Sequence, residues 1–181
     1  MSRTHVTSRS FLSAALVAAA ALAPHPAAAQ ATSLDDPTVI AIFDAANTWD
    51  METGAIARRK GSTNEVRDFG AMLARDHQVV RRQGRDLVKK LGVRPTPPAD
   101  FAMARDHAVA LRTLRARSGT AFDRAFLQHE VAFHTAVIDA VNTTLLPALK
   151  NEEARALVTK VAPAFQAHML AAQALLDKQP K

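Results

Sequence analysis

The chain of 181 residues is long enough for one domain with a sizeable core, and its 23 lysines and arginines outnumber 17 aspartates and glutamates. It contains no cysteine, which excludes disulfides, thiolate metal sites, iron–sulfur clusters and c-type haem attachment. The absence of tyrosine excludes tyrosyl-radical chemistry, and a single tryptophan leaves few side chains to stack on nucleic-acid bases.

Residues 1–29 have the pattern of a secretory signal peptide. Arg3 and Arg9 precede an apolar run over 11–23, and the alanines at 27–29 satisfy the small-residue cleavage rule. The run is shorter than the roughly 20 residues that span a bilayer. We therefore expect cleavage, a periplasmic or secreted protein without a transmembrane segment in its mature chain, and a short mobile arm at 30–36.

The first long helix is predicted over 37–60. Asp35 is placed to cap it, Pro37 fits its first position, and Gly61 ends it. Ile42, Ala46, Trp49, Thr53 and Ile56 mark the face that we expect to be buried, and Glu52 lies beside that face.

The second long helix is predicted over 63–91, ending at Gly92. Ser62 and Glu65 have the spacing of a capping box. The apolar stripe of this helix has His77 at its centre, and Asp76 lies beside the stripe.

A proline-rich connection at 94–99 leads to a shorter helix over 100–117. A third long helix follows over 121–146, with Thr120 and Asp123 in a capping pattern. His134 lies in its apolar stripe, and Glu130 is a neighbour.

The fourth long helix is predicted over 152–177, with Asn151 as its cap. His168 lies in its apolar stripe. Pro163 removes one backbone hydrogen bond and displaces the carbonyl of Thr159, so we expect a kink or a break there.

No alternating pattern of strands competes with these helices. The sequence therefore predicts an all-α domain over 37–178, an antiparallel four-helix bundle with an extra short helix in the connection between the second and third long helices.

Each long helix carries a metal-ligating side chain at or beside its apolar stripe. The candidate ligands are His77, His134, His168, Glu52, Asp76 and Glu130. Imidazole and carboxylate together suit iron, zinc, manganese or copper. The alternative is a set of core histidines bonded to backbone or carboxylate groups. We expect His107 and His129 at the surface or at its boundary.

In two antiparallel helices, residues at equal distances from the connecting turn lie opposite each other. This reflection about the turn tests whether the candidate residues lie at one level along the helices. It places His134 within a turn of His168, so the two can meet. It places Asn47 opposite His77 and leaves Glu52 about 9 Å away along the axis, which makes Glu52 the weakest candidate.

Known catalytic motifs are missing from the sequence. The spacing of His129, Glu130 and His134 is one residue too long for a zinc protease motif, so the two histidines do not share a helix face. The paired E-x-x-H motifs of di-iron bundles, the P-loop, the dinucleotide glycine motif and the nucleophile elbow are also missing. The sequence therefore gives no reason to expect an enzyme.

A set of short motifs resembles the bacterial exported family called domain of unknown function 4142, which is placed in the ferritin-like superfamily. The motifs are Met51-Glu52, Phe69-x-x-Met72-x-x-x-Asp76-His77, Leu114-x-x-x-x-Gly119-x-x-Phe122-Asp123-x-x-Phe126, His134 and Pro163-x-x-x-x-His168. Phe126 stands where the family often has Tyr, and Ala162 where it often has Leu. The resemblance covers about 38–176. It implies a ferritin-like helical bundle outside the cytoplasm, sometimes labelled an outer-membrane protein, and no established activity.

Two functions follow from these patterns. The first is a periplasmic helical bundle that binds a transition metal in its core. The second is a metal-free envelope or stress-associated module whose basic clusters contact anionic surfaces. These clusters lie at 58–60, 81–90 and 112–117. An exported protein seldom meets nucleic acid, so we do not expect a nucleic-acid partner.

Overall fold

The computed structural model describes residues 34–98 and 101–180. The predicted signal peptide at 1–29 and arm residues 30–33 lie outside this range. The described chain forms α1 (Asp36–Lys60), α2 (Asn64–Leu91), α3 (Ala102–Ala116), α4 (Gly119–Ala140), a π-helical turn (Val141–Leu145), α5 (Leu146–Ala148) and α6 (Glu152–Asp177). These residues contain no strand, so the all-helical prediction is confirmed. None of their helices combines the length and the apolar character needed to cross a membrane.

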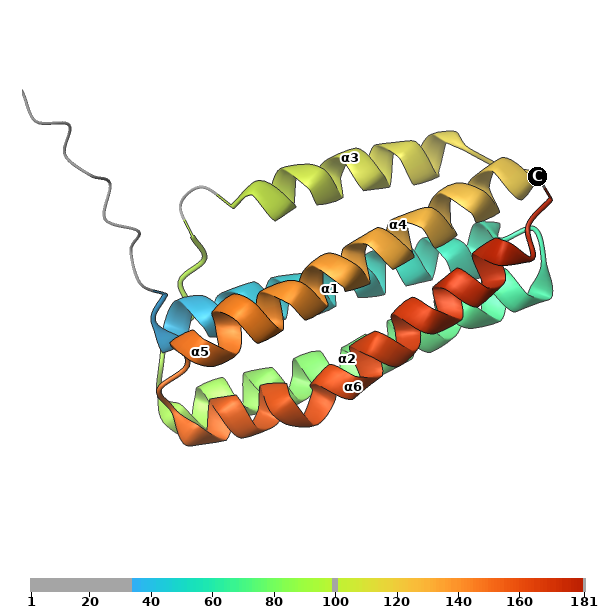
Figure 1. Ribbon diagram of the computed structural model, residues 1–181. Coiled ribbons are helices and arrows are strands. Elements are labelled where there is room, and N and C mark those ends of the chain that lie inside the picture. The colour runs from blue at the N-terminus through green and yellow to red at the C-terminus, as the bar shows by residue number, and fades with distance from the viewer. Residues whose placement is uncertain (1–33, 99–100, 181) are drawn as a thin grey trace, which may run out of the picture. The chain divides into compact units, whose positions relative to one another are not determined.

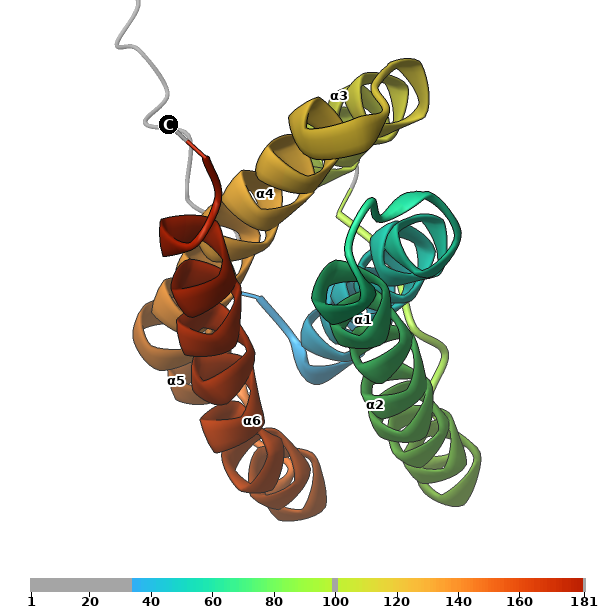
Figure 2. The same cartoon turned by 90° about the vertical axis from the view of Figure 1, so that its right-hand side faces the viewer.

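The four long helices pack side by side, with α3 on one flank. Figures 1 and 2 show α1 beside α2 and α4 beside α6, and α2 also contacts α6. The predicted extra helix is present as α3, which contacts α1 and α4. Only His107 and Leu114 of α3 are buried, so this helix is less embedded than its neighbours.

The contact between α1 and α2 is close enough to require glycine. A Cβ atom on Gly70 would lie 2.6 Å from the Cβ of Ala57 and 2.7 Å from the carbonyl oxygen of Gly54. A Cβ on Gly54 would in turn lie 2.7 Å from the carbonyl oxygen of Gly70. The two glycines therefore let the backbones approach, and they fix how α1 and α2 are aligned.

Two predicted helix caps are confirmed. The Asp35 carboxylate accepts a hydrogen bond of 2.9 Å from the Thr38 amide, and the Asn151 side chain accepts one of 3.0 Å from the Ala154 amide. At both termini the cap satisfies a backbone donor that has no partner within the helix.

The predicted caps of α2 and α4 are wrong. Thr63, not Ser62, caps α2 by accepting from the Val66 amide. The Ser62 amide donates instead to Asp123 Oδ1 at 2.9 Å, and the Ser62 hydroxyl donates to Asp123 Oδ2. Asp123, which lies inside α4 and is fully buried, therefore joins the α1–α2 turn to α4.

α4 differs from the prediction at its ends, and α6 differs in having no break at Pro163. The helix predicted over 121–146 begins at Gly119, and it passes through a π-helical turn before α5. α6 has the predicted bounds, and it continues through Pro163 without a break.

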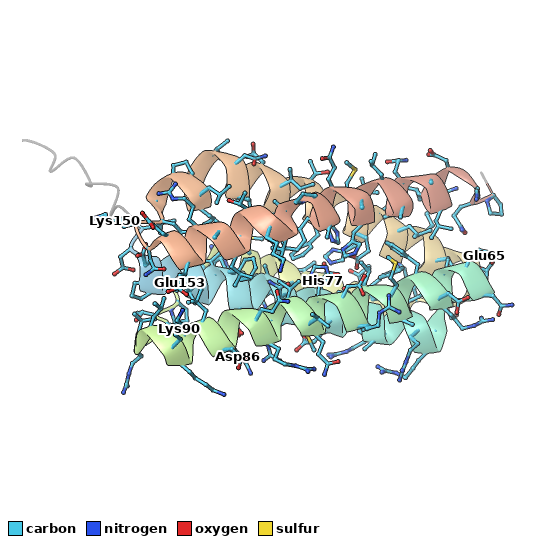
Figure 3. The ribbon with its side chains drawn as sticks, turned by 90° about the horizontal axis from the view of Figure 1, so that it is seen from below. Glu65, His77, Asp86, Lys90, Lys150 and Glu153 are labelled. Atoms are coloured by element: carbon cyan, nitrogen blue, oxygen red, sulfur yellow. The ribbon has the colours of Figure 1, made fainter. Side chains whose placement is uncertain are left out.

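The core consists of two apolar clusters at different positions along the long helices. One contains Phe43, Val137 and Phe165, and the other contains Leu73, Phe126 and Leu127. Along each long helix, polar residues lie between the segments that supply the two clusters. Figure 3 shows His77 near the middle of α2, whereas Lys90 pairs with Glu153 near one end.

Candidate metal centre

Six polar side chains are buried at one level between the two apolar clusters. They have between 0% and 6% of their surface exposed, and they come from all four long helices: Asn47 and Asp50 of α1, His77 of α2, Glu130 and His134 of α4, and His168 of α6. Burying such groups costs free energy unless partners compensate them. Their contacts therefore decide what the site can do.

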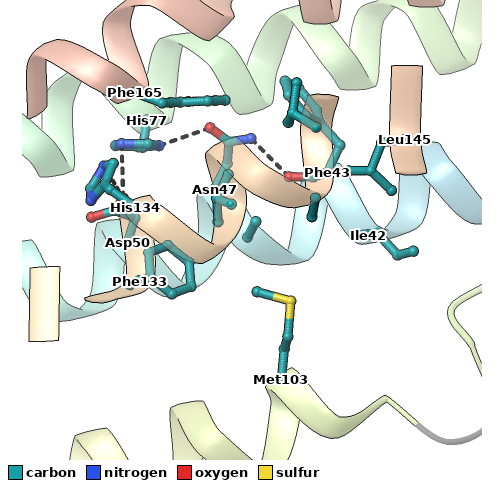
Figure 4. A pocket seen from close by; sticks show the side chains of 14 residues that line it. Ile42, Phe43, Asn47, Asp50, His77, Met103, Phe133, His134, Leu145 and Phe165 are labelled. Carbon is teal, nitrogen blue, oxygen red and sulfur yellow. Dashed lines mark hydrogen bonds and ion pairs between the residues drawn. The ribbon is translucent and has the colours of Figure 1, made fainter. Parts of the chain in front are cut away.

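The inner atoms of four of these residues converge. Asp50 Oδ2 lies 2.9 Å from His77 Nε2 and 3.1 Å from His134 Nε2. His77 Nε2 also lies 3.2 Å from His168 Nδ1. The three imidazoles each offer a nitrogen, and these nitrogens lie within 4.8 Å of one another. Figure 4 shows His77 and His134 beside Asp50.

The outer ring nitrogen of His77 faces a fixed acceptor. Asn47 Nδ2 donates to the Phe43 carbonyl at 2.8 Å, which orients the amide so that its Oδ1 faces His77. His77 Nδ1 lies 2.9 Å from that oxygen and must be the donor. In a neutral His77 ring, Nε2 therefore carries a lone pair directed at the cluster.

The other two rings repeat this arrangement. His134 Nδ1 donates to the Glu130 carbonyl at 3.0 Å, and His168 Nε2 lies 3.4 Å from Asp76 Oδ2. All three histidines thus have an oxygen acceptor on the outer side and an inner nitrogen that faces the cluster. Histidine ligands of metal ions are commonly held in this way, because an outer acceptor fixes the tautomer and the ring orientation.

Asp50 carries a buried negative charge that needs a balancing positive charge. Burial works to raise the pKa of Asp50, but positive charge on His77 and His134 holds this pKa below its usual value. Asp50 is therefore an anion that lies beside the two Nε2 atoms and the Glu130 carboxyl. Either protons on these nitrogens or a metal ion can supply the balancing charge.

Burial sets the protonation of two further groups. It raises the pKa of Glu130 well above its usual value, and the Asp50 charge adds to this effect. It lowers the pKa of His168 to about 4, with His77 and His134 contributing. The metal-free site therefore combines a Glu130 carboxyl that burial makes harder to ionise with a His168 ring that is neutral at neutral pH.

The structure brings together four of the six predicted ligands. His77, His134 and His168 converge, and Glu130 offers a carboxylate oxygen near Asp50 and His134. Asp76 lies on the outer side of His168, where it also accepts a hydrogen bond of 2.9 Å from Arg75.

Glu52 lies outside the cluster. Its side chain is 50% exposed, and its Oε2 lies 2.9 Å from His107 Nε2 of α3. The expectation of a surface position for His107 is wrong, because this residue is buried and its ring stacks on Trp49 at 5.3 Å. Glu52 thus links α1 to α3. His129 is partly buried, as expected for a boundary residue.

The sequence analysis missed Asp50 as a candidate ligand. The signal was present in the spacing, since Phe43, Asn47, Asp50 and Gly54 recur every three or four residues and are all buried. The stripe chosen from the sequence placed Trp49 on the core face, whereas Trp49 is only partly buried and packs against Phe101 and His107. This choice turned the predicted face of α1 away from Asp50.

Comparisons with known proteins identify one family. A family model described as a domain of unknown function, DUF4142, matches residues 21–175. Neither the curated proteins nor the solved structures give a match.

Proposed function

The chain belongs to the family described as domain of unknown function DUF4142, and we propose that it binds a divalent transition-metal ion in its core. The proposed ligands are His77 Nε2, His134 Nε2, His168 Nδ1 and Asp50 Oδ2. Glu130, whose pKa is raised by burial in the metal-free protein, lies beside them as a neighbouring carboxyl group.

The observation that carries this proposal is the threefold arrangement of the histidines. Each ring has an oxygen acceptor at its outer nitrogen, and each inner nitrogen faces the shared centre. The contacts of 2.9, 3.1 and 3.2 Å between donor atoms are close to the separation of about 3 Å expected between ligands that are each about 2 Å from one ion.

The donor set selects a class of metal. Three imidazoles and one carboxylate suit iron, zinc, manganese or copper, whereas calcium and magnesium prefer oxygen ligands. The proposed carboxylate, Asp50, brings negative charge to a buried position, and Asp76 adds negative charge behind His168, which favours a divalent cation.

We further propose the setting in which this site operates. The four long helices would form an antiparallel four-helix bundle of the ferritin-like type, with α3 beside it. Signal-peptide cleavage after residue 29 would place the bundle in the periplasm or outside the cell. Both proposals rest on sequence patterns given above.

The alternative, a metal-free module that contacts anionic surfaces, has less support. Arg75, Arg85 and Lys90 of the basic α2 surface are paired with Asp76, Asp44 and Glu153. Exposed pairs of this kind reduce the charge available to a partner. Salt-sensitive binding of the metal-free protein to anionic vesicles would support this alternative.

Metal analysis tests the proposal. The purified protein is stripped with a chelator, reloaded with Fe(II), Zn(II), Mn(II) or Cu(II), dialysed and analysed for metal content and thermal stability. We expect about one ion per chain, and a stabilisation of about 2.7 kcal/mol at a free concentration one hundred times the Kd.

Matched glutamine variants locate the site. His134→Gln should abolish binding, whereas His129→Gln, on the same helix but outside the cluster, should retain it. Equal metal content in wild type and His134→Gln would refute the proposed site.

A further inference from the structure

An apolar cavity borders the candidate metal centre on one side. Asp50, His77 and His134 form one wall of it together with Asn47, and the remaining walls are apolar side chains from α1, α3, α4, the π-helical turn and α6. Figure 4 shows Ile42, Phe43, Phe133 and Leu145 around this space. Its free volume of about 20 Å³ has room for a water-sized molecule.

The surface of the cavity is apolar, and the polar residues among its walls lie on the side of the candidate metal centre. Three of the four proposed ligands line it, whereas His168, Glu130 and Asp76 do not. A molecule in the cavity would therefore approach an ion held by Asp50, His77 and His134 from a single direction. The proposed protein ligands leave further coordination positions for such a molecule on an ion that accepts more than four ligands.

The π-helical turn contributes to this cavity. Val141 and Leu145 line it, and both are buried, with 1% and 5% of their surface exposed. They mark the two ends of the turn. Such turns are frequent at functional sites, because they change which side chains a helix directs inward.

We infer that the cavity admits a small uncharged molecule, of the size of nitric oxide or dioxygen, to an open coordination position on the bound metal. This inference rests on the proposed function. The apolar walls disfavour an anion, since a charge there would lose its hydration without gaining partners away from the metal. A neutral diatomic molecule loses little on entering and gains a bond to the ion.

Nitric oxide is a suitable probe because its adducts with ferrous ions are seen by electron paramagnetic resonance and by absorption. The wild-type protein is loaded with Fe(II) without oxygen, analysed for iron, and titrated with nitric oxide. We expect a saturable adduct at one per bound iron. An excess of azide, an anion, should not displace nitric oxide.

Cavity-filling variants test whether nitric oxide occupies this cavity when it binds the metal. Ala140→Leu and Ala46→Val each add carbon atoms to a wall of the cavity without changing a proposed ligand. Because nitric oxide would have to displace these atoms, we expect its affinity to fall at least about tenfold. Two variants from different helices are used so that a folding defect in one leaves the other. The matched control is Ala174→Leu, which lies on the exposed face of α6 and should bind like the wild type.

The possible results separate the two proposals. A protein that retains none of iron, zinc, manganese and copper refutes the proposed function, and the inference falls with it. A protein that retains another of these metals but no iron refutes the inference alone. Iron content near one per chain without a nitric oxide adduct refutes the inference alone. Equal affinity for nitric oxide in the wild type and in iron-loaded Ala140→Leu and Ala46→Val also refutes it.

Discussion

Replacing Gly70 by alanine tests whether the close contact of α1 and α2 determines the stability of the fold. The added Cβ would lie 2.6 Å from Ala57 Cβ, 2.7 Å from the Gly54 oxygen and 2.8 Å from the Arg58 nitrogen. Two of these atoms belong to the α1 backbone and cannot rotate away. α1 and α2 must therefore separate or shift.

The size of the effect follows from two opposing contributions. Overpacking a tight contact costs about 1–3 kcal/mol, and contact with backbone atoms favours the upper end of that range. Alanine in place of glycine inside a helix returns up to about 1 kcal/mol. We expect a net loss of about 2 kcal/mol, or a fall of about 4–8 °C in Tm for a domain of this size.

Gly84→Ala on the same helix is the control. Its added Cβ would lie 3.6 Å from Phe43 Cδ1, which is an ordinary van der Waals distance. The helix preference of alanine should therefore appear as a gain of up to about 1 kcal/mol. Both variants are measured by thermal and urea unfolding of metal-free protein. If Gly70→Ala is as stable as Gly84→Ala, the helices are not held in the contact described.

Three further predictions concern the centre and its support. Asn47→Ala removes the acceptor at His77 Nδ1 and should lower metal affinity about 10–100-fold in a titration against a competing chelator, and an unchanged affinity would contradict the role of Asn47. Asp123→Ala removes both hydrogen bonds to Ser62 and should cost about 1.5–3 kcal/mol in urea unfolding. A loss below about 0.5 kcal/mol, which is the scatter of surface substitutions, would show that this link is unimportant. Burial lowers the pKa of His129 from 6.5 to about 4, so the unfolded chain binds more protons between these values and metal-free protein should lose stability as the pH falls from 6.5 towards 4. His129→Gln should flatten this dependence in thermal midpoints, and an identical profile would contradict it.

Local signals in the sequence were sufficient for most helix bounds. Asp35 and Asn151 cap their helices as predicted, because a cap depends on a few adjacent residues. The level of the site also followed from geometry, since reflection about the α1–α2 turn placed Asn47 opposite His77, and the two are hydrogen bonded. The first inference depends only on neighbouring residues, and the second depends only on helix geometry and chain order.

The remaining errors have a common physical cause in tertiary contacts. Ser62 fits a capping box, but Asp123, which is 61 positions away, offers both its hydroxyl and its amide a carboxylate. The helical spacing of apolar residues predicts Trp49 on the core face, whereas Trp49 packs beside α3 and leaves the core face to Asp50. A sequence pattern alone does not show which helix covers which face.

The structure of the metal-loaded protein tests the central claim most directly. The account predicts anomalous scattering from one ion, within about 2.0–2.2 Å of His77 Nε2, His134 Nε2, His168 Nδ1 and Asp50 Oδ2. His77 Nδ1 should remain bonded to Asn47. An ion bound elsewhere, or a metal-soaked crystal in which the four donors surround no ion, would contradict it.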